Sequence, residues 1–485
     1  MSYQVPQNIN KNKIFVLNKS EIGNRLDAHY NKPAYIELWQ TLSTNSYSLS
    51  NLKNNSICIF SGITPKSGGD AYVLNDGIPF LRSGDFSETN EINFSNLLQL
   101  RKDIHNTTMR GSQLKKGDLL IAIVGATIGK IGVYVYDIEA NINQAICAVR
   151  LKPELNPYYV QAFFQTGIGQ TIIDRVKRPV ARANINLEEV GSLPIPMLDK
   201  QQQAKIVKVM NEGFNSLKEK KKEAQKLLES IDNYFLGTLG IQLPERKSQT
   251  LQDRMFIVNN SVLEGRLDPY YSQEYFRNAF EVLGACKYSV VNLKEISMLI
   301  TSGITPKSGG DAYTEDKSIG IPFVRSGNIS IDGELNYDDL LYLKPEIHEN
   351  VMSSSKLKKD DILIAIVGAT IGQVGIYLSE GEANINQAIA LVRLKEGYNA
   401  QFVKELIKSS IGQLSLNRLK RPVARANINL EEISRIKVVL PPEEKQEEIV
   451  EHITAIRQQA KVLQEEGKAI LEQAKRKVEG MILYG

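Results

Sequence analysis

The chain repeats itself, because long stretches of its first half recur about 240 residues later. SGITPKSGGDAY occupies positions 61–72 and again 302–313, and LIAIVGATIG occupies 120–129 and again 363–372. A period this long excludes a solenoid of short repeats, whose units span a few tens of residues. One whole domain is therefore present twice. Two copies can place equivalent surfaces about a local two-fold axis, which suits a two-fold object such as duplex DNA.

Bulk properties restrict the class of protein. A chain of 485 residues predicts two or more domains. Its net charge of +4 neither requires nor excludes nucleic acid, because a balanced protein can carry a locally positive face. Cys58, Cys147 and Cys286 are isolated, which argues against zinc-binding pairs and disulfide frameworks. There is no apolar signal segment and no run near eighteen apolar residues, so we expect a cytoplasmic protein without a membrane span.

Each half begins with a globular part that predicts a mixed α/β domain. DLLIAIVG at 118–125 and its copy DILIAIVG at 361–368 are short, β-branched and preceded by turns, which is typical of buried strands. Residues 158–165 and 401–409 have the pattern of helices that flank a sheet. The expected bounds of the two globular domains are 14–198 and 255–441.

Each globular part is followed by a stretch with the pattern of one long helix. Apolar residues recur there at three-, four- and seven-residue steps, which predicts amphipathic helices with a coiled-coil seam. A lone helix would expose its apolar stripe, so we expect the two helices to pair, and the two-fold relation makes the pairing antiparallel. The expected bounds are 199–242 and 442–485, with a linker at 243–254. The expected stripes are Ile206, Met210, Leu217, Ala224, Leu228, Ile231 and Phe235, and Ile449, Ile453, Ile456, Leu463, Ile470, Ala474 and Val478.

Several short motifs occur in the same order in both halves. Each half carries Arg-Leu-Asp-x-x-Tyr near its start, at 25–30 and 266–271, followed by GITP, IPFxRSG and LIAIVGATIG. An Asn-Gln pair follows at 143–144 and 386–387, and a proline-led start of the long helix with Gln446 completes the set. In this order, the motifs resemble those of the DNA-specificity (S) subunit of type I restriction-modification systems. The first half departs at the helix start, where it has PIPMLDKQQQ in place of PPEEKQ.

The resemblance implies a protein without catalytic activity and without a cofactor of its own. Each globular part would be a target-recognition domain that reads one part of a split site in double-stranded DNA. The helix pair would set the distance between the parts. Two DNA adenine methyltransferase subunits, on which S-adenosylmethionine is expected, and further restriction subunits of the helicase-nuclease type would assemble around the chain.

Three patterns that suggest other chemistry fail on closer inspection. GATIGK at 125–130 is one residue too short between its glycines for a phosphate loop, and Gln373 replaces Lys130 in the second copy. DPYY at 268–271 lacks the second proline of the methyltransferase loop. His105 and His348 occupy equivalent positions but have no metal-ligand spacing, so we expect a surface or loop role for them. We therefore expect no catalytic residue and no metal site.

The residues that favour DNA contact are basic and polar, and they lie in expected loops of both copies. The KSGG segments offer backbone donors to phosphates. Arginine can hold guanine O6 and N7 together, and asparagine can do the same for adenine N6 and N7. A solvated surface charge is the alternative for each of them. The predicted DNA-binding residues are Lys66, Ser67, Arg82, Lys177, Arg178, Arg182 and Asn184 in the first copy, and Lys307, Ser308, Arg325, Lys420, Arg421, Arg425 and Asn427 in the second.

The near-identity of the polar loops predicts half-sites that are the same or closely similar, in inverted orientation. Equal side chains on equal scaffolds should select equal bases, although residues 85–101 differ from their counterparts at 328–344. Two other functions stay open. A stand-alone sequence-specific repressor would bind DNA tightly without a methyltransferase, and a protein scaffold built on the long helices would ignore DNA.

Overall fold

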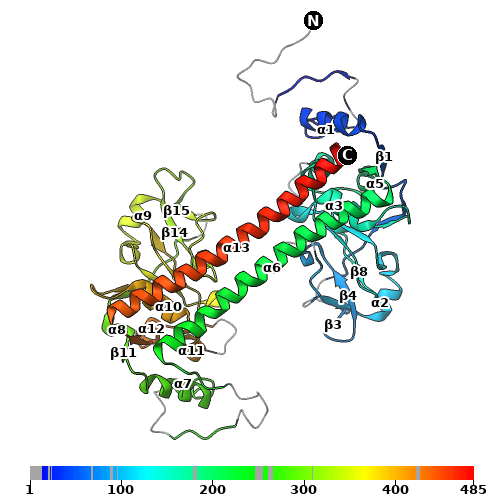
Figure 1. Cartoon of the computed structure of the whole chain (residues 1–485). Helices are drawn as coiled ribbons and strands as arrows, with labels where there is room; N and C mark the ends of the chain where they lie inside the picture. The colour runs from blue at the N-terminus through cyan, green and yellow to red at the C-terminus, as the bar shows by residue number, and fades with distance from the viewer. Residues whose placement is uncertain are drawn as a thin grey trace. The chain divides into compact units, whose positions relative to one another are not determined.

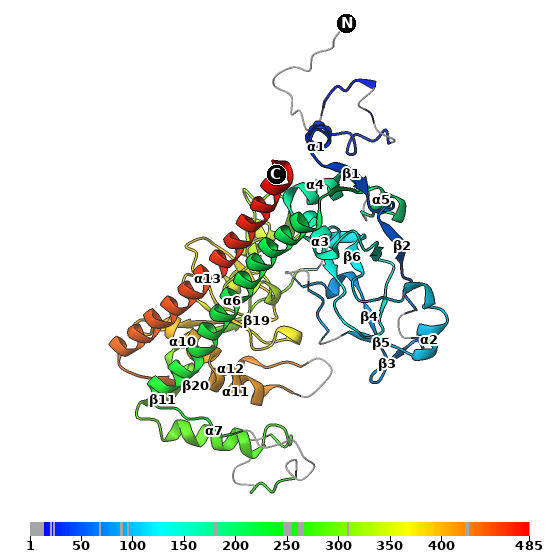
Figure 2. The same ribbon diagram turned by 45° about the vertical axis from the view of Figure 1, so that its right-hand side comes forward.

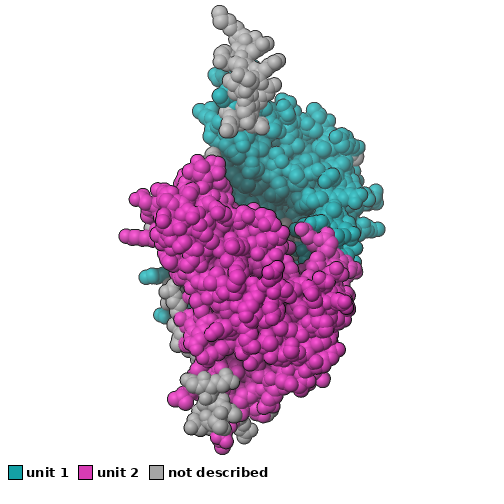
Figure 3. All heavy atoms as spheres, turned by 90° about the vertical axis from the view of Figure 1, so that its left-hand side faces the viewer, with its two compact units in different colours: residues 1–222, 462–485 teal, residues 223–461 magenta. Residues whose placement is uncertain are grey.

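The chain forms two compact units in a computed structural model, and each unit includes one end of each long helix. Residues 1–222 with 462–485 form the first unit, and residues 223–461 form the second (Figure 3). The division crosses both long helices, so each unit holds one copy of the repeat and a segment of each helix. The predicted domain bounds stay predictions. The structure describes residues 14–19, 22, 25–66, 69–87, 91–94, 97–178, 183–245, 255–259, 266–307, 310–421 and 426–484.

The first unit contains three small sheets and the helices that cover them (Figure 1). Its strands are β1 (Ser48–Asn51), β2 (Ser56–Ser61), β3 (Tyr72–Val73), β4 (Ile78–Leu81), β5 (Leu98–Leu100), β6 (Leu119–Ala122), β7 (Ile131–Val133), β8 (Asn141–Ile142), β9 (Ile146–Leu151) and β10 (Pro194–Met197). Its shorter helices are α1 (Pro33–Ser43), α2 (Lys102–Asn106), α3 (Pro157–Gln165), α4 (Gly167–Val176) and α5 (Leu187–Ser192), with 3-10 turns η2 (Ser83–Asp85), η3 (Arg110–Ser112) and η4 (Gly125–Thr127). The sheet orders are β2-β9-β6-β7, β3-β5-β4-β8 and β1-β10.

The second unit repeats this topology and adds one short helix, α8, between β11 and β12. Its strands are β11 (Ser289–Asn292), β12 (Ser297–Ser302), β13 (Tyr313–Thr314), β14 (Ile321–Val324), β15 (Leu341–Leu343), β16 (Ile362–Ala365), β17 (Val374–Ile376), β18 (Asn384–Ile385), β19 (Ile389–Leu394) and β20 (Lys437–Leu440). Its shorter helices are α7 (Glu274–Gly284), α8 (Leu293–Ile296), α9 (Pro345–Glu349), α10 (Ala400–Lys408), α11 (Ser410–Leu419) and α12 (Leu430–Ser434), with turns η7 (Ser326–Asn328), η8 (Ser353–Ser355) and η9 (Gly368–Thr370). The orders are β12-β19-β16-β17, β13-β15-β14-β18 and β11-β20.

The predicted mixed α/β fold is confirmed in both copies. Most strand pairs are antiparallel, and β4 with β8 in the first unit, like β14 with β18 in the second, is parallel. Strand β6 is fully buried, as its apolar sequence predicts. Leu119 and Ile121 face the core shared with α3 and α4, whereas Leu120 and Ala122 face the core shared with β4 and β8. Burial on both faces explains why this strand shows no polar alternation.

Two long helices, α6 (Lys200–Leu239) and α13 (Glu443–Leu483), follow the globular parts as predicted. They have 40 and 41 residues, so each extends about 60 Å at ~1.5 Å per residue. Helix α6 ends just before Gly240, whose φ of 69° is a left-handed conformation that favours glycine. Figure 2 shows the two helices from a second direction.

Within each unit the helix segments pack antiparallel. In the first unit a Cβ at Gly213 would lie 2.7 Å from the Cβ of Ala474, and Lys220 Nζ donates to Glu466 Oε2 at 2.8 Å. Partner numbers on α13 fall as numbers on α6 rise, which defines the antiparallel direction. In the second unit the rings of Tyr234 and His452 continue this order, with centroids 3.9 Å apart.

The end of α13 completes the core of the first unit. Val478 and Ile482 are fully buried there, together with residues of β6, α3 and α4. Glu479 Oε1 accepts a hydrogen bond from the backbone N–H of Ile168 at 3.0 Å, at the first turn of α4. The first unit is therefore assembled from residues more than 300 positions apart in the chain.

The predicted apolar stripe of α13 is wrong at one position. Ile470 is 36% exposed, and its neighbour Leu471 is buried beside Gly213 of α6. Buried positions 460, 463, 467, 471, 474 and 478 keep the three- and four-residue steps of a helix seam. Gly467 takes a seam position because Leu217 and Lys220 approach its Cα closely. Because Gly467 contributes no apolar side chain to the seam, the sequence pattern indicated Ile470 in place of Leu471.

Candidate nucleic-acid interface

The Asn-Gln pair lies in a turn that two other motifs contact through the backbone. In the first unit the N–H of Asn143 donates to the carbonyl of Leu81 at 3.0 Å, directly before Arg82. The N–H of Gly62, at the start of the GITP loop, donates to the carbonyl of Asn143 at 3.3 Å. These bonds bring the GITP loop, the arginine at the end of β4 and the Asn-Gln turn to one edge of the domain.

The glycine that opens the GITP loop is required because the backbone beside the Asn-Gln turn approaches it closely. A Cβ at Gly62 would lie 1.6 Å from the carbonyl oxygen of Ile142. A Cβ at Gly303 would lie 1.7 Å from that of Ile385 in the second unit. Backbone cannot yield as a flexible side chain can, so any larger residue must displace the Asn-Gln turn.

A side-chain hydrogen bond also links the GITP loop to the Asn-Gln turn. The hydroxyl of Thr64 donates to the amide oxygen of Gln144, and Thr305 donates in the same way to Gln387. All four residues are exposed. With its oxygen engaged, each glutamine presents its amide nitrogen as a donor at the surface.

The basic loop reaches the same edge by pairing with the glycine turn after β6. The N–H of Gly125 donates to the carbonyl of Ala183 at 3.0 Å, and the N–H of Ile185 donates to that of Ile123 at 3.0 Å. The N–H of Ile123 in turn donates to Ala145 at 2.9 Å, just after the Asn-Gln pair. The second unit repeats this pattern, so in each unit the basic loop, the glycine turn, the Asn-Gln turn and the GITP loop adjoin one another.

Several predicted DNA-binding residues are accessible at this edge. Lys66, Lys307, Asn184 and Asn427 are exposed. Ser67, Arg182, Ser308 and Arg425 lie outside the described residues.

The two strand-end arginines are held by acidic or carbonyl groups of their own domain. Arg82 is exposed and its Nη2 lies 3.5 Å from Asp85 Oδ1, within η2. Arg325 is half-buried and its Nη2 donates to the carbonyl of Asp339 at 2.8 Å. Both arginines are therefore oriented in advance, at the cost of sharing their charge with a carboxylate.

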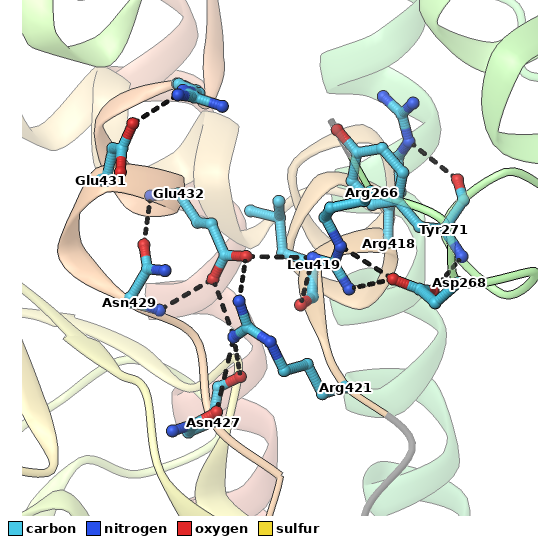
Figure 4. Close-up of polar contacts among 11 residues, drawn as sticks. Arg266, Asp268, Tyr271, Arg418, Leu419, Arg421, Asn427, Asn429, Glu431 and Glu432 are labelled. Carbon is cyan, nitrogen blue, oxygen red and sulfur yellow. Dashed lines mark hydrogen bonds and ion pairs between the residues drawn. The ribbon is translucent and has the colours of Figure 1, made fainter. Parts of the chain in front are cut away.

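The first arginine of the basic loop is part of an ionic network in each unit. Arg421 Nη2 donates to Glu432 Oε1 at 2.8 Å, and the same oxygen accepts from Arg266 Nη1 at 3.0 Å (Figure 4). The second glutamate oxygen accepts from the backbone N–H of Asn429 at 2.9 Å, which caps α12. The first unit has the same network, built from Arg178, Arg25 and Glu189.

The tyrosine of Arg-Leu-Asp-x-x-Tyr stacks between two guanidinium groups. The ring of Tyr271 lies 4.5 Å from Cζ of Arg266 and 3.9 Å from Cζ of Arg418 (Figure 4). Asp268 receives hydrogen bonds from Arg266 and from the backbone N–H of Tyr271. In the sequence this motif was evident only as a mark of resemblance. The same Arg-Leu-Asp-x-x-Tyr motif occurs at 25–30. This duplication was the signal that could have identified the motif as a tyrosine clamp, which holds the start of the domain against the basic loop.

The first lysine of the basic loop is also engaged. Lys177 Nζ pairs with Asp174 Oδ1 at 2.9 Å, and Lys420 Nζ donates to Asn417 Oδ1 at 2.7 Å. Partial burial lowers the pKa of Lys420 from its ordinary value. Among the described cations of this edge, Lys66 and Lys307 are therefore the ones whose side chains have neither an ion pair nor a hydrogen bond, and both are exposed.

The patterns that suggested enzymes have structural roles. In the GATIGK turn Lys130 Nζ donates to the carbonyl of Phe86 at 3.1 Å, which takes it away from any phosphate. Asp268 of the DPYY segment supports the tyrosine clamp described above. His105 and His348 are 2% and 1% exposed, so the expected surface or loop role is wrong. Their burial follows from a hydrogen bond to Asn141 and Asn384, which no local sequence pattern reveals.

Comparison with known sequences identifies the family. Residues 53–227 and 287–473 each match the family described as "Type I restriction modification DNA specificity domain". The chain belongs to this family. The two matched stretches cover most of the chain and coincide with the two copies of the repeat, so the resemblance inferred from the motifs is confirmed.

Individual relatives agree with the family match. The chain is 28% identical to the EcoBI specificity subunit of a type I restriction enzyme from Escherichia coli, over 33% of each chain. It thus spans a third of the length of that relative. Identity to the MjaX type I specificity subunit of Methanocaldococcus jannaschii is 23%, over 90% of this chain and 92% of the relative. A solved chain from a type I restriction-modification complex is 14% identical, with a TM-score of 0.46, covering 90% of this chain and 96% of that one.

No helix within the described part of the chain combines the length and apolar character needed to cross a bilayer.

Proposed function

We propose that the chain is a non-catalytic subunit that recognises a split site in double-stranded DNA, one part with each unit. The observation that carries this proposal is the convergence, in both units, of the GITP loop, the Asn-Gln turn and the basic loop at one edge. Exposed lysines there suit phosphate contacts, and the exposed amides of Gln144 and Gln387 suit base edges in the major groove. Family membership supports the same conclusion.

Methylation of the DNA would be carried out by partner subunits. Two adenine methyltransferase subunits would bind the chain, hold S-adenosylmethionine on their own residues and flip the target adenine out of the stack. Restriction subunits of the helicase-nuclease type would join the same assembly. Isothermal titration of the isolated chain with S-adenosylmethionine should show no binding, and saturable binding would contradict the assignment of the cofactor to the partners.

The two half-sites should be the same or closely similar, in inverted orientation. The basic loop, the Asn-Gln turn and the threonine–glutamine hydrogen bond are repeated in both units, and equal side chains in equal surroundings select equal bases. Sequencing of methylated adenines in cells that express the chain with its methyltransferase tests this. Two unrelated half-sites would refute the equivalence and leave the split-site proposal intact.

A gel-shift assay distinguishes this function from those of a repressor and of a scaffold. A repressor would bind its site tightly alone, and a scaffold would not respond to DNA at all. We expect specific binding to strengthen when the methyltransferase subunits are added.

A further inference from the structure

The second unit contains a buried histidine whose free ring nitrogen faces two carboxylates. His348, on α9, is 1% exposed, and its Nδ1 lies 2.6 Å from Oδ1 of Asn384 on β18. The amide nitrogen of Asn384 donates to the carbonyl of Met352 at 2.8 Å and to Ser355 Oγ at 3.2 Å. The amide oxygen must therefore accept from Nδ1–H. In the neutral ring this fixes the tautomer and leaves the lone pair on Nε2.

That lone pair has no hydrogen-bond partner among the described residues, although the atom is buried. Glu349 Oε1 and Glu382 Oε2 each lie 3.6 Å from Nε2. Both carboxylates are mostly exposed, with side-chain exposures of 60% and 65%. Two carboxylates that face this nitrogen favour a positive charge between them, either a proton on Nε2 or a bound cation. The three groups together offer the ligand atoms of a cation site.

The first unit shows the same histidine in a satisfied state. His105 Nδ1 lies 2.6 Å from Asn141 Oδ1, as in the second copy, but Gln113 Nε2 donates to His105 Nε2 at 3.1 Å. Two differences remove this arrangement from the second copy. Lys356 replaces Gln113, and Glu349 replaces Asn106, while the glutamate at position 382 is kept from position 139. The second copy has lost the donor to the ring and gained a carboxylate.

We propose that the second unit binds a divalent transition-metal ion of the zinc type through His348 Nε2, Glu349 and Glu382, with water completing the coordination. The three ligand atoms lie within 4.8 Å of one another. Zinc bonds of about 2.0–2.2 Å place neighbouring ligands roughly 3.3 Å apart, so the exposed glutamates need only small movements. Asn384 holds the ring as an outer partner of a metal-bound histidine does.

Lys356 is the competitor for this site. Its Nζ lies 2.6 Å from the other oxygen of Glu349 and supports the carboxylate where no metal is bound. Its flexible chain can turn into solvent when a divalent cation arrives. A bound ion would join α9 to the segment just before β18, and thus stabilise the support of the Asn386–Gln387 turn. The proposal is independent of the DNA-binding role.

Titration of the full chain with Zn²⁺ in a calorimeter tests the site. We expect one site per chain, and a loss of affinity of at least about tenfold in Glu349→Asn and in Glu382→Gln. Glu349→Asn installs the residue found at position 106, so the fold should tolerate it. Glu380→Gln removes an exposed carboxylate two residues from Glu382 and should leave zinc binding unchanged.

A spectroscopic readout follows the histidine itself. The chain has four histidines, so ¹⁵N-histidine labelling gives few ring signals. Zn²⁺ should shift Nε2 of His348 in the wild type and not in the double variant Glu349→Asn/Lys356→Gln, which restores the chemistry of the first copy. The proposal is overturned by a wild type that binds no Zn²⁺, by equal binding in the glutamate variants, or by a His348 ring protonated on both nitrogens and unresponsive to the metal.

Discussion

The guanidinium of Arg266 donates to the carboxylate of Glu432 at 3.0 Å across 166 positions of sequence. Their side chains are 17% and 10% exposed. Glu432 also accepts from Arg421 and caps α12, so one carboxylate joins the start of the domain, the basic loop and the helix that follows it. The position of the basic loop thus depends on a partly buried ionic network.

Glu432→Gln should lower the free energy of unfolding of the second unit by about 2 kcal/mol, because two arginines lose their charged partner. Urea denaturation of the full chain measures this. The neighbouring Glu431→Gln is the control. Glu431 and its partner Arg435 are 71% and 63% exposed, so a change within about 0.5 kcal/mol is expected. Equal effects of the two variants would show that the network does not stabilise the unit.

Gly62→Ala and Gly303→Ala should each abolish recognition of one half-site, because a Cβ collides with the backbone that positions the Asn-Gln turn. Gly111→Ala serves as the control, since open space surrounds that position. Methylation by the assembled complex reports the effect. Normal methylation by both turn variants would separate this turn from DNA recognition.

Lys66→Ala and Lys307→Ala should weaken binding to all DNA sequences similarly. Each substitution should reduce the slope of log affinity against log salt by about one, because each lysine would neutralise one phosphate. Lys116→Ala removes an exposed lysine before the opposite end of β6 and should leave the slope unchanged. An unchanged slope in the Lys66 and Lys307 variants would remove these residues from the interface.

Lys408 should make the stability of the second unit depend on alkaline pH. Burial lowers the pKa of Lys408 to about 8, and the nearby positive charges of Arg457 and Lys404 act in the same direction. The carboxylates of Glu405 and Asp332 raise this pKa but do not cancel the effect. Between about pH 8 and the ordinary lysine pKa, the unfolded chain binds more protons than the folded one, so stability should rise with pH. Lys408→Gln, which copies Gln165 of the first unit, should lack this rise. The difference between the two chains in urea denaturation at pH 7, 8.5 and 10 measures it, and parallel curves would contradict the shift.

Insertion of seven residues into each long helix, after position 222 and after position 461, should lengthen the preferred spacer. Seven residues keep the seam in register and add about 10 Å, or roughly three base pairs. Methylated-site sequencing should show unchanged half-sites with a longer spacer. An unaltered spacer would refute the role of the helices as a ruler.

Much of the fold could be predicted because the sequence patterns that indicate its strands and helices are local or occur in both copies. The buried strand β6, the helices α3 and α10 and the two long helices follow from periodicity and from the proline and glycine residues at their ends. The seam register at Ile470 was wrong because glycine carries no apolar signal.

The candidate site could be predicted only in part. Its motifs were identifiable because they occur twice, but the residues that restrain them were not. Glu189 and Glu432 lie in short helices that the sequence patterns did not predict, and one arginine partner of each lies more than 150 positions away. The environment of His348 likewise depends on Glu382, which only the sheet pairing of β18 brings near.

The packing of α13 into the core of the first unit has a consequence for synthesis on the ribosome. Ile168, Val478 and Ile482 belong to one folded unit, yet the last two residues leave the ribosome after the whole second unit has been made. Part of the core of the first domain therefore stays open to solvent until the end of α13 has been made. A chain that stops before the end of α13 lacks the residues that close this core, so its first unit should be less stable than that of the full chain.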